Sequence, residues 1–508
     1  MTTPLDPRTP VIIGVGQYSE KLDDADYGAL SPMDMAGRAL GAAIADAQAR
    51  GDVADAIDTL GAIRQFEIST PAAIAPFGKS DNPPRAIAKR VGADPARAIL
   101  EVVGGQGPQR LVGEFAADIS KGRAKVAAIV GSEAISTTLA LVAKGEKPDW
   151  SEEPGGEMED RGFGMDGVLD TALIAHGVHG AIPAYALMEN ARRKKLGRSL
   201  EEHREHMAQL FAPFTEVAAD NPHAAAPVAR TAQDIATPTD RNRIVAEPYT
   251  KSMIARDQVN QAAAIIVASV EAARELGVPE DRWVHIHAVS DAKEASPMHR
   301  ADLHLAPSAV DSARAALEMA DTTVADVKHF DIYSCFPIPV SNLIEALGIA
   351  GDDPRGLTLT GGLPFFGGAG NNYSAHGIAE AVERCRKQPG SRAMVIANGG
   401  FMSKYAAGIY STTPADWSQQ RVKTCDDQPD AVAAVDAYDG AATIETYTVQ
   451  FSKKGPRGTV IARTPDGERV AAMPADDAAL ALLEAGEPFG QTVDIAHGGG
   501  LNRFSVPS

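Results

Sequence analysis

The alternation of short apolar segments with amphipathic helical ones constrains the fold of this chain more than any other feature. Residues 10–18 form an apolar run closed by glycines, and Ser31 is the predicted N-cap of the helical pattern that follows. Residues 57–63 and 125–133 repeat the strand pattern, and a long amphipathic run precedes the second of them. Strands that alternate with helices predict an α/β domain with helices over a central sheet.

This rhythm breaks down over residues 134–254 and then returns. The interruption contains loops and separate helices, which we expect at about 184–196 and 200–211. A second α/β half follows, with predicted strands at 283–289, 329–333 and 393–400 and a helix at 309–319. The last of these strands and the strand at 126–133 hold equivalent places in the two halves, which suggests an internal duplication.

The end of the chain is rich in short strands. Residues 418–430 are polar and are predicted to be a linker. Strand candidates follow at 442–449, 458–463 and 469–473, and Asp466-Gly467 is the predicted hairpin turn between the last two. We therefore expect a small β-barrel domain over residues 432–508.

Composition limits the partners. The formal charge of −19 repels nucleic acid and anionic membrane surfaces. No apolar run reaches the roughly 18 residues of a membrane span, and the N-terminus does not have the pattern of a signal peptide. Three scattered cysteines give no disulfide framework, and His176 and His179 have no third ligand nearby for a metal. We expect a cytoplasmic protein without a metal site.

One loop carries a family resemblance. Glu101-Val102-Val103-Gly104-Gly105-Gln106-Gly107-Pro108, the helical run to Lys121-Gly122 and the strand after it resemble the nucleophile loop, buried helix and following strand of the thiolase superfamily, particularly its sterol-carrier-protein type. The resemblance implies two βαβαβαββ halves in five α-β-α-β-α layers, spanning residues 1–133 plus 255–278 and 279–417. It also implies an inserted loop domain at 134–254. The C-terminal β-barrel is similar to an extra domain that some thiolase-like proteins carry.

The resemblance places the catalytic positions on unusual residues. The nucleophilic cysteine falls on Gly105, and the chain has only Cys335, Cys385 and Cys425. Tyr333 fills the histidine position of the second loop, Gly368 is aligned with the catalytic histidine of the glycine-histidine-proline loop, and Ala397 replaces the acid/base cysteine. Claisen chemistry needs a thiolate and a base, and neither glycine nor alanine supplies them.

Some catalytic features remain. The resemblance implies an oxyanion hole built from the backbone N–H groups of Gly105 and Gly399. Tyr333, Asn372 and Tyr373 carry groups that can donate hydrogen bonds, and Tyr333 also has the alternative role of a core tyrosine. Related aldolases that cleave hydroxyacyl-CoA place a tyrosine in this second loop and need a β-barrel partner.

Three functions follow from the resemblance. The chain is an acyltransferase-type protein similar to acetyl-CoA acetyltransferases, a lyase that cleaves 3-hydroxyacyl-CoA with Tyr333 as acid/base, or a non-catalytic acyl-CoA or lipid binder. A coenzyme A thioester is the expected ligand, and no other cofactor is required. The basic residues Arg192, Arg193, Lys194 and Lys195 are candidates to meet its phosphates, or they form a solvated helix face. We expect a monomer or homodimer, with an acyl-CoA enzyme as a possible partner.

Overall fold

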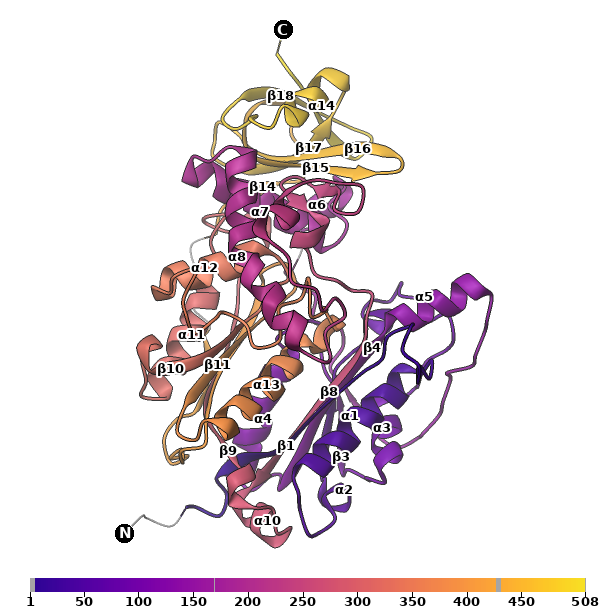
Figure 1. Ribbon diagram of the computed structural model, residues 1–508. Helices are drawn as coiled ribbons and strands as arrows, with labels where there is room; N and C mark the ends of the chain where they lie inside the picture. Colours follow the sequence, from indigo (N-terminus) through magenta and orange to yellow (C-terminus); the bar gives the residue numbers. More distant parts are fainter. Residues whose placement is uncertain (1–4, 169, 426–430, 508) are drawn as a thin grey trace.

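Two groups of apolar strands, joined through β1 and β9, form the body of the molecule (Figure 1). The computed structural model describes residues 5–168, 170–425 and 431–507. The first half contributes β1 (Pro10–Ser19), β2 (Thr59–Ala62), β3 (Arg97–Leu100), β4 (Val126–Ala134), β5 (Glu159–Asp160) and β8 (Asn260–Ser269). The second half contributes β9 (Val284–Lys293), β10 (Val327–Ile332), β11 (Arg392–Gly399) and β12 (Lys404–Ser411). The strand order is β10-β11-β12-β9-β1-β8-β4-β2-β3-β5.

The central strands are buried along their whole length. Every residue of β4 and β8 is buried, and the two strands pair antiparallel with Ile129 opposite Ile265. Strands covered on both faces need nearly continuous apolar sequence, which is the pattern that residues 126–133 and 260–269 show. The strand predicted at residues 125–133 is confirmed.

Helices complete five layers. Two helices, α4 (Gly107–Ser120) and α13 (Tyr373–Lys387), lie between the halves and contact strands of both. The outer layers and ends are formed by α1 (Pro32–Asp46), α2 (Val53–Ala56), α3 (Pro83–Val91), α10 (Val270–Glu275), α11 (Pro307–Met319) and α12 (Pro337–Leu347). Of these, α1 packs on β1, β4 and β8, and α11 packs on β9 and β12. Ser31 caps α1 by accepting a hydrogen bond from the Asp34 N–H at 3.1 Å, as predicted.

Residues 171–254 of the inserted loop domain lie between the body and the C-terminal domain (Figure 1, magenta), whereas residues 135–144 lie beside the first half. Its helices are α5 (Ile135–Lys144), α6 (Thr171–Ala175), α7 (Ala181–Leu196), α8 (Leu200–Asp220) and α9 (Ala232–Ala236). The predicted end of α8 at residue 211 is wrong: the helix runs through Pro213 because Phe214 and Ala218 pack into the core. Within the described ranges, no helix combines the length and the apolarity needed to cross a bilayer.

The C-terminal domain is rich in strands, as predicted. It contains β14 (Ala434–Val435), β15 (Gly440–Ser452), β16 (Gly455–Arg463), β17 (Arg469–Pro474), β18 (Thr492–Gly498), β19 (Leu501–Ser505) and the helix α14 (Asp477–Glu484). Its strand pairs form a ring, β15-β16-β17-β19-β18-β15. The predicted turn between β16 and β17 is present, with Gly467 at φ +85°.

Several short segments cross the domain ranges that the sequence predicts, including β5, which falls in the predicted loop domain but pairs with β3 of the first half. Residues 422–425 form β13 (Val422–Cys425), a parallel partner of β9, so this part of the predicted linker belongs to the body. Residues 426–430 of that linker lie outside the described residues. From the loop domain, β6 (Ile244–Ala246) and β7 (Tyr249–Thr250) extend the C-terminal sheet beside β15. The loop domain and the C-terminal domain therefore share one sheet.

A buried arginine fastens these two domains together. Arg193 of α7 is fully buried and donates hydrogen bonds to the Gly486 carbonyl at 2.6 Å and the Tyr447 hydroxyl at 3.2 Å. It also forms an ion pair with Glu487 at 2.6 Å. Beside it, the Asn190 amide donates to the Tyr447 carbonyl at 2.9 Å. Polar groups buried in this way are costly to leave unpaired, so this contact resists separation.

We predict that Arg193→Met lowers the free energy of unfolding by about 2–4 kcal/mol, because it leaves buried acceptors without a donor. Urea unfolding measures the change. The matched control is Lys195→Met, since Lys195 is exposed on the same helix and its removal is expected to cost less than about 0.5 kcal/mol. Equal effects of the two substitutions would contradict this account of the domain contact.

Candidate active site

The loop between β3 and α4 is fixed in place by the second half of the body. The Gly104 N–H donates a hydrogen bond to Asn371 Oδ1 at 2.9 Å, and the Ser374 hydroxyl donates to the Gly105 carbonyl at 2.6 Å. The Asn371 amide also donates to the Arg64 carbonyl at 2.7 Å. These contacts hold Gly105 at the start of α4, where the helix dipole favours negative charge.

Tyr333 occupies the space that a side chain at residue 105 needs. A Cβ atom placed on Gly105 overlaps the Tyr333 hydroxyl, and it lies 2.7 Å from Tyr333 Cε2 and 2.5 Å from the Asn398 carbonyl oxygen. All of these separations are shorter than real Cβ contacts. The Tyr333 phenol and the Asn398 carbonyl therefore both exclude a side chain at residue 105.

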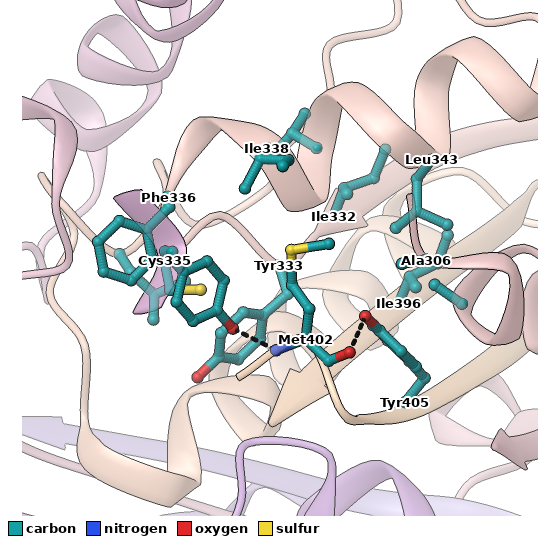
Figure 2. Close-up of a cluster of buried hydrophobic side chains, with 14 of the residues drawn as sticks. Ala306, Ile332, Tyr333, Cys335, Phe336, Ile338, Leu343, Ile396, Met402 and Tyr405 are labelled. Carbon is teal, nitrogen blue, oxygen red and sulfur yellow. Dashed lines mark hydrogen bonds between the residues drawn. The ribbon is translucent and has the colours of Figure 1, made fainter. Parts of the chain in front are cut away.

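The Tyr333 hydroxyl is buried without a hydrogen-bond partner among the described residues. Tyr333 follows β10, where its N–H donates to the Ile396 carbonyl at 3.0 Å, and its ring meets the Tyr373 ring edge-on, with centroids 5.2 Å apart. Across the part of the chain that the structure describes, its hydroxyl has no hydrogen bond. Tyr333 is 7% exposed, and burial raises the pKa of its phenol well above the usual value (Figure 2). The phenol is therefore protonated and can donate as well as accept.

Gly399 and Gly105 lie side by side, as the resemblance implies. Gly399 ends β11, and a Cβ atom placed on it lies 2.9 Å from the Gly105 nitrogen. The Gln106 side-chain amide fills the adjoining space, and its buried Oε1 has no hydrogen-bond partner among the described residues. An oxygen of a ligand that approached both glycines would have to displace this amide.

Ala397 contributes only a methyl group, next to a buried polar residue. Ala397 is fully buried in β11 opposite Ala406. The next residue, Asn398, donates from its amide to the Tyr185 hydroxyl at 2.9 Å and to Cys335 Sγ at 3.5 Å. Burial raises the pKa of the Cys335 thiol to about 12, so this cysteine is neither ionised nor nucleophilic at neutral pH.

A side chain at Gly368 would contact none of the other predicted site residues. A Cβ atom on Gly368 meets Arg256, Leu363 and Ala255 at 3.3–3.5 Å, none of which is a predicted site residue. In the same loop, the Leu363 N–H donates to Ser334 Oγ, next to Tyr333, at 3.3 Å. The alignment of Gly368 with the catalytic histidine stays a prediction, and as a glycine it supplies no side chain for acid/base chemistry.

The other polar candidates have structural contacts. The Asn372 amide donates to the Gly131 carbonyl at 2.8 Å, which ties the turn to β4. The Tyr373 hydroxyl lies 2.5 Å from Thr360 Oγ1 in a buried polar chain that reaches Asp331. The residues that hold the Gly105 loop are instead their neighbours Asn371 and Ser374, which the sequence analysis missed.

The four basic residues do not form a phosphate cluster. Arg192 is buried and paired with Glu345, and Arg193 is turned inward against the C-terminal domain. Only Lys194 and Lys195 are exposed. The prediction for the two arginines is therefore corrected, because their charges are already used inside the protein. Among the described residues, no three His, Cys, Asp or Glu side chains lie close enough to hold a metal ion.

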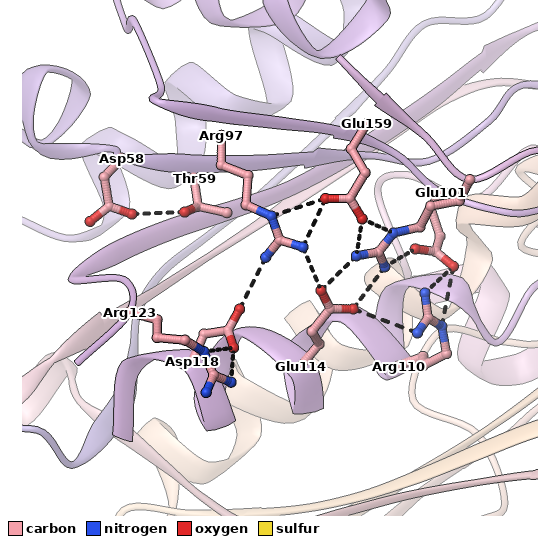
Figure 3. A network of polar contacts seen from close by, with 10 residues as sticks. Asp58, Thr59, Arg97, Glu101, Arg110, Glu114, Asp118, Arg123 and Glu159 are labelled. Carbon is pink, nitrogen blue, oxygen red and sulfur yellow. Dashed lines mark hydrogen bonds and ion pairs between the residues drawn. The ribbon is translucent and has the colours of Figure 1, made fainter. Parts of the chain in front are cut away.

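A buried lysine and an ion-pair network support the Gly105 loop. Lys404 is 5% exposed, and its Nζ donates to the Val103 carbonyl at 2.7 Å. Burial lowers its pKa to about 8. Figure 3 shows the network beside the loop, in which the fully buried Glu101 is paired with Arg110 and Arg161. The only sequence signal for Lys404 is its place at the start of an apolar strand.

Comparisons with known proteins agree with this architecture. A family model for the additional C-terminal domain of thiolase-like protein type 1 matches residues 422–500. The crystal structure of a monomeric SCP2-thiolase-like protein type 1 from Mycobacterium smegmatis has 42% sequence identity and a TM-score of 0.84, with 99% of this chain and 100% of that chain covered. None of the curated proteins compared matches this chain.

Two more distant structures share the fold alone. The Ltp2-ChsH2(DUF35) aldolase has 18% identity and a TM-score of 0.57, with 80% of this chain and 98% of that chain covered. Acetyl-CoA acetyltransferase from Syntrophomonas wolfei has 16% identity and a TM-score of 0.57, with 80% and 99% covered. These matches confirm the predicted thiolase fold.

We predict that Gly105→Ala destabilises the protein by about 1–3 kcal/mol, because its Cβ meets the Tyr333 phenol. In a Tyr333→Ala background, the same change is expected to cost at least about 1 kcal/mol less. Chemical denaturation of the four proteins gives this coupling energy. Gly41→Ala in α1 is the control, since nothing lies within 4 Å of its Cβ and alanine favours a helix. Additive effects would show that the two positions do not compete for space.

We predict a pH dependence of stability that belongs to Lys404. The unfolded lysine holds its proton up to about pH 10.5 and the folded one only to about 8, so stability rises with pH between these values. The stability of the wild type relative to Lys404→Met should be flat from pH 6 to 8 and increase by at most about 3 kcal/mol above that. Urea unfolding at a series of pH values tests this, and a constant difference would contradict the burial of a charged amine.

Proposed function

This chain belongs to the SCP2-thiolase-like proteins of type 1, and we propose that it acts on acyl-CoA thioesters without a cysteine nucleophile. The more distant likeness to an acetyl-CoA acetyltransferase supports a thioester ligand. The chain's own residues argue against acyl transfer through cysteine, because residue 105 has no thiol and Cys335 is a buried, protonated one.

The reaction that fits best is cleavage of a 3-hydroxyacyl-CoA. As the C2–C3 bond breaks, Tyr333 Oη accepts the 3-hydroxyl proton while its own phenol proton passes to C2. The electron pair of the broken bond becomes the new C2–H bond, and enolate character develops on the thioester oxygen during this step. The products are an aldehyde or ketone and a shortened acyl-CoA, and Tyr333 ends in its starting form.

One observation carries this proposal: the Tyr333 hydroxyl lies where a side chain at residue 105 would be, and Gly105 lies beside Gly399. A proton carrier there faces the backbone N–H groups proposed to hold the enolate oxygen. A protonated phenol suits a relay in which one proton is accepted as another is given, since no ionised tyrosinate has to form in the buried site.

The C-terminal domain also supports the proposed cleavage of a 3-hydroxyacyl-CoA. The Ltp2-ChsH2(DUF35) aldolase joins two chains. We propose that the domain fused here takes the place of a separate partner and that the protein works as a monomer, as its relative from Mycobacterium smegmatis is described. The shared sheet with the loop domain keeps the fused domain beside the body.

A second function is binding of an acyl-CoA thioester without turnover. Burial favours it, since Gly105, Gln106, Tyr333 and Gly399 are all buried and the Gln106 amide fills the space between the glycines. In that case the phenol and the two N–H groups bind the ligand's oxygens and no bond is broken.

The test is turnover of matched 3-hydroxyacyl-CoA and 3-ketoacyl-CoA panels, followed by mass spectrometry. We expect cleavage of the hydroxyacyl-CoA and a loss of about 10²–10⁴-fold in kcat for Tyr333→Phe. Tyr410→Phe is the matched control, because its buried hydroxyl contacts Gln109 in the core and its removal should leave kcat unchanged.

The outcomes separate the functions. Thiolysis of 3-ketoacyl-CoA would overturn the claim that no cysteine nucleophile is used. Binding of both thioesters without cleavage would replace the lyase with the binding protein. Cleavage that Tyr333→Phe leaves intact would remove the tyrosine from the mechanism.

A further inference from the structure

The turn after Gly399 is held in an unfavourable backbone conformation. Residues 399–403 connect β11 to β12, and Met402 within this turn has φ +55°. A residue with a Cβ costs roughly 1–2 kcal/mol in this left-handed region, and such strain persists only where the surroundings enforce it. The contacts that enforce it therefore decide where Gly399 lies.

Three side chains enforce the conformation of Met402. Its N–H donates to the Tyr185 hydroxyl at 3.0 Å, and its carbonyl accepts from the Tyr405 hydroxyl at 2.7 Å (Figure 2). The same carbonyl accepts from Arg300 Nη2 at 2.9 Å, and Arg300 also donates to the Phe401 carbonyl at 2.7 Å. Hydrogen bonds from α7, from β12 and from the segment that carries Arg300 thus hold the turn.

Arg300 is an unusual residue to find there. Its side chain is buried, 1% exposed, and among the described residues it forms no ion pair. It is satisfied by carbonyl groups, including that of Ala295 at 2.9 Å, and by Met188 Sδ. A buried cation without a counter-ion is expensive, so its place has to be maintained by the segment that carries it.

The C-terminal domain holds that segment. Arg469 of β17 is fully buried and donates to the carbonyl of Arg300 and, at 3.3 and 3.4 Å, to those of Pro297 and Met298. Its guanidinium is oriented by Glu445, with two contacts of 2.9 Å. One arginine from the additional domain thus fixes the backbone from which the second arginine reaches the turn.

We propose that the C-terminal domain positions the 399–403 turn, and with it Gly399 beside Gly105, through Arg469 and Arg300. Arg469 sets the 297–301 segment, and Arg300 transmits that position to the carbonyls of Phe401 and Met402. Both arginines are positioning residues. This inference concerns backbone geometry and stands apart from the reaction proposed above.

Hydrogen exchange of the full-length, ligand-free protein tests the proposal at the Met402 and Ser403 amides. Arg300→Lys and Arg469→Lys keep the charge but lose the fork that reaches several carbonyls. Each is expected to raise exchange in the 399–403 turn about tenfold, and Arg469→Met is expected to raise it further. Arg469→Lys decides the question if the methionine variant does not fold.

A matched control separates positioning from general loosening of the domain. Arg193→Met removes another fully buried arginine at the same domain boundary, but its hydrogen bonds end on residues 190, 198, 447, 486 and 487. It should leave exchange in the 399–403 turn unchanged. Because Arg469 acts through Arg300, adding Arg469→Lys to Arg300→Lys should produce no further increase.

The proposal is overturned if Arg469→Lys exchanges like the wild type in this turn, if Arg193→Met raises exchange there equally, or if the two lysine substitutions act additively. Since no ligand is present, each result holds whether or not the protein cleaves a hydroxyacyl-CoA.

Discussion

The competition between Tyr333 and residue 105 for one volume is the constraint on which the site depends. With glycine at 105, the phenol lies in the space beside the loop, where it and the Asn398 carbonyl leave no room for a side chain at residue 105. The residues that hold the Gly105 loop do not depend on which side chain fills this space. The Gly105 loop is still fixed by Asn371 and Ser374 and still opens α4. A protic side chain therefore lies at the position that the thiolase resemblance assigns to a nucleophile, and the fold by itself does not fix the chemistry.

The additional C-terminal domain contacts the segment that supports this site. It shares a sheet with the loop domain, and buried arginines bind the two on one side and reach the 297–301 segment on the other. Buried arginines that are satisfied by carbonyls specify position strictly, because each displaced acceptor leaves a charge unpaired. A strained residue such as Met402 requires that kind of support. The 399–403 turn is thereby coupled to the C-terminal domain, which is far from it in sequence.

The sequence predicted those parts of the fold that local patterns determine. A continuous apolar run identified β4, Ser31 marked the start of α1, and Asp466-Gly467 marked a hairpin. The sequence-based predictions failed where contacts between distant segments determine the structure. Arg192 and Arg193 look like a basic helix end until β15 and residues 486–487 cover Arg193 and Glu345 meets Arg192. Residues 422–425 look like a linker, but they pair with β9. Tyr333 and Gly105 were each identified, but their overlap was not, since no spacing along the chain reveals it.

The central claim is that Tyr333 meets the reacting hydroxyl of a thioester ligand at the position of residue 105. The most direct measurement is a crystal structure with a 3-hydroxyacyl-CoA analogue in which nitrogen replaces the thioester sulfur, so that the ligand resists cleavage. The account predicts the 3-hydroxyl oxygen within about 2.6–3.2 Å of Tyr333 Oη and the carbonyl oxygen directed at the Gly105 and Gly399 N–H groups. An analogue bound away from these three residues, with Tyr333 still enclosed by protein, would contradict it.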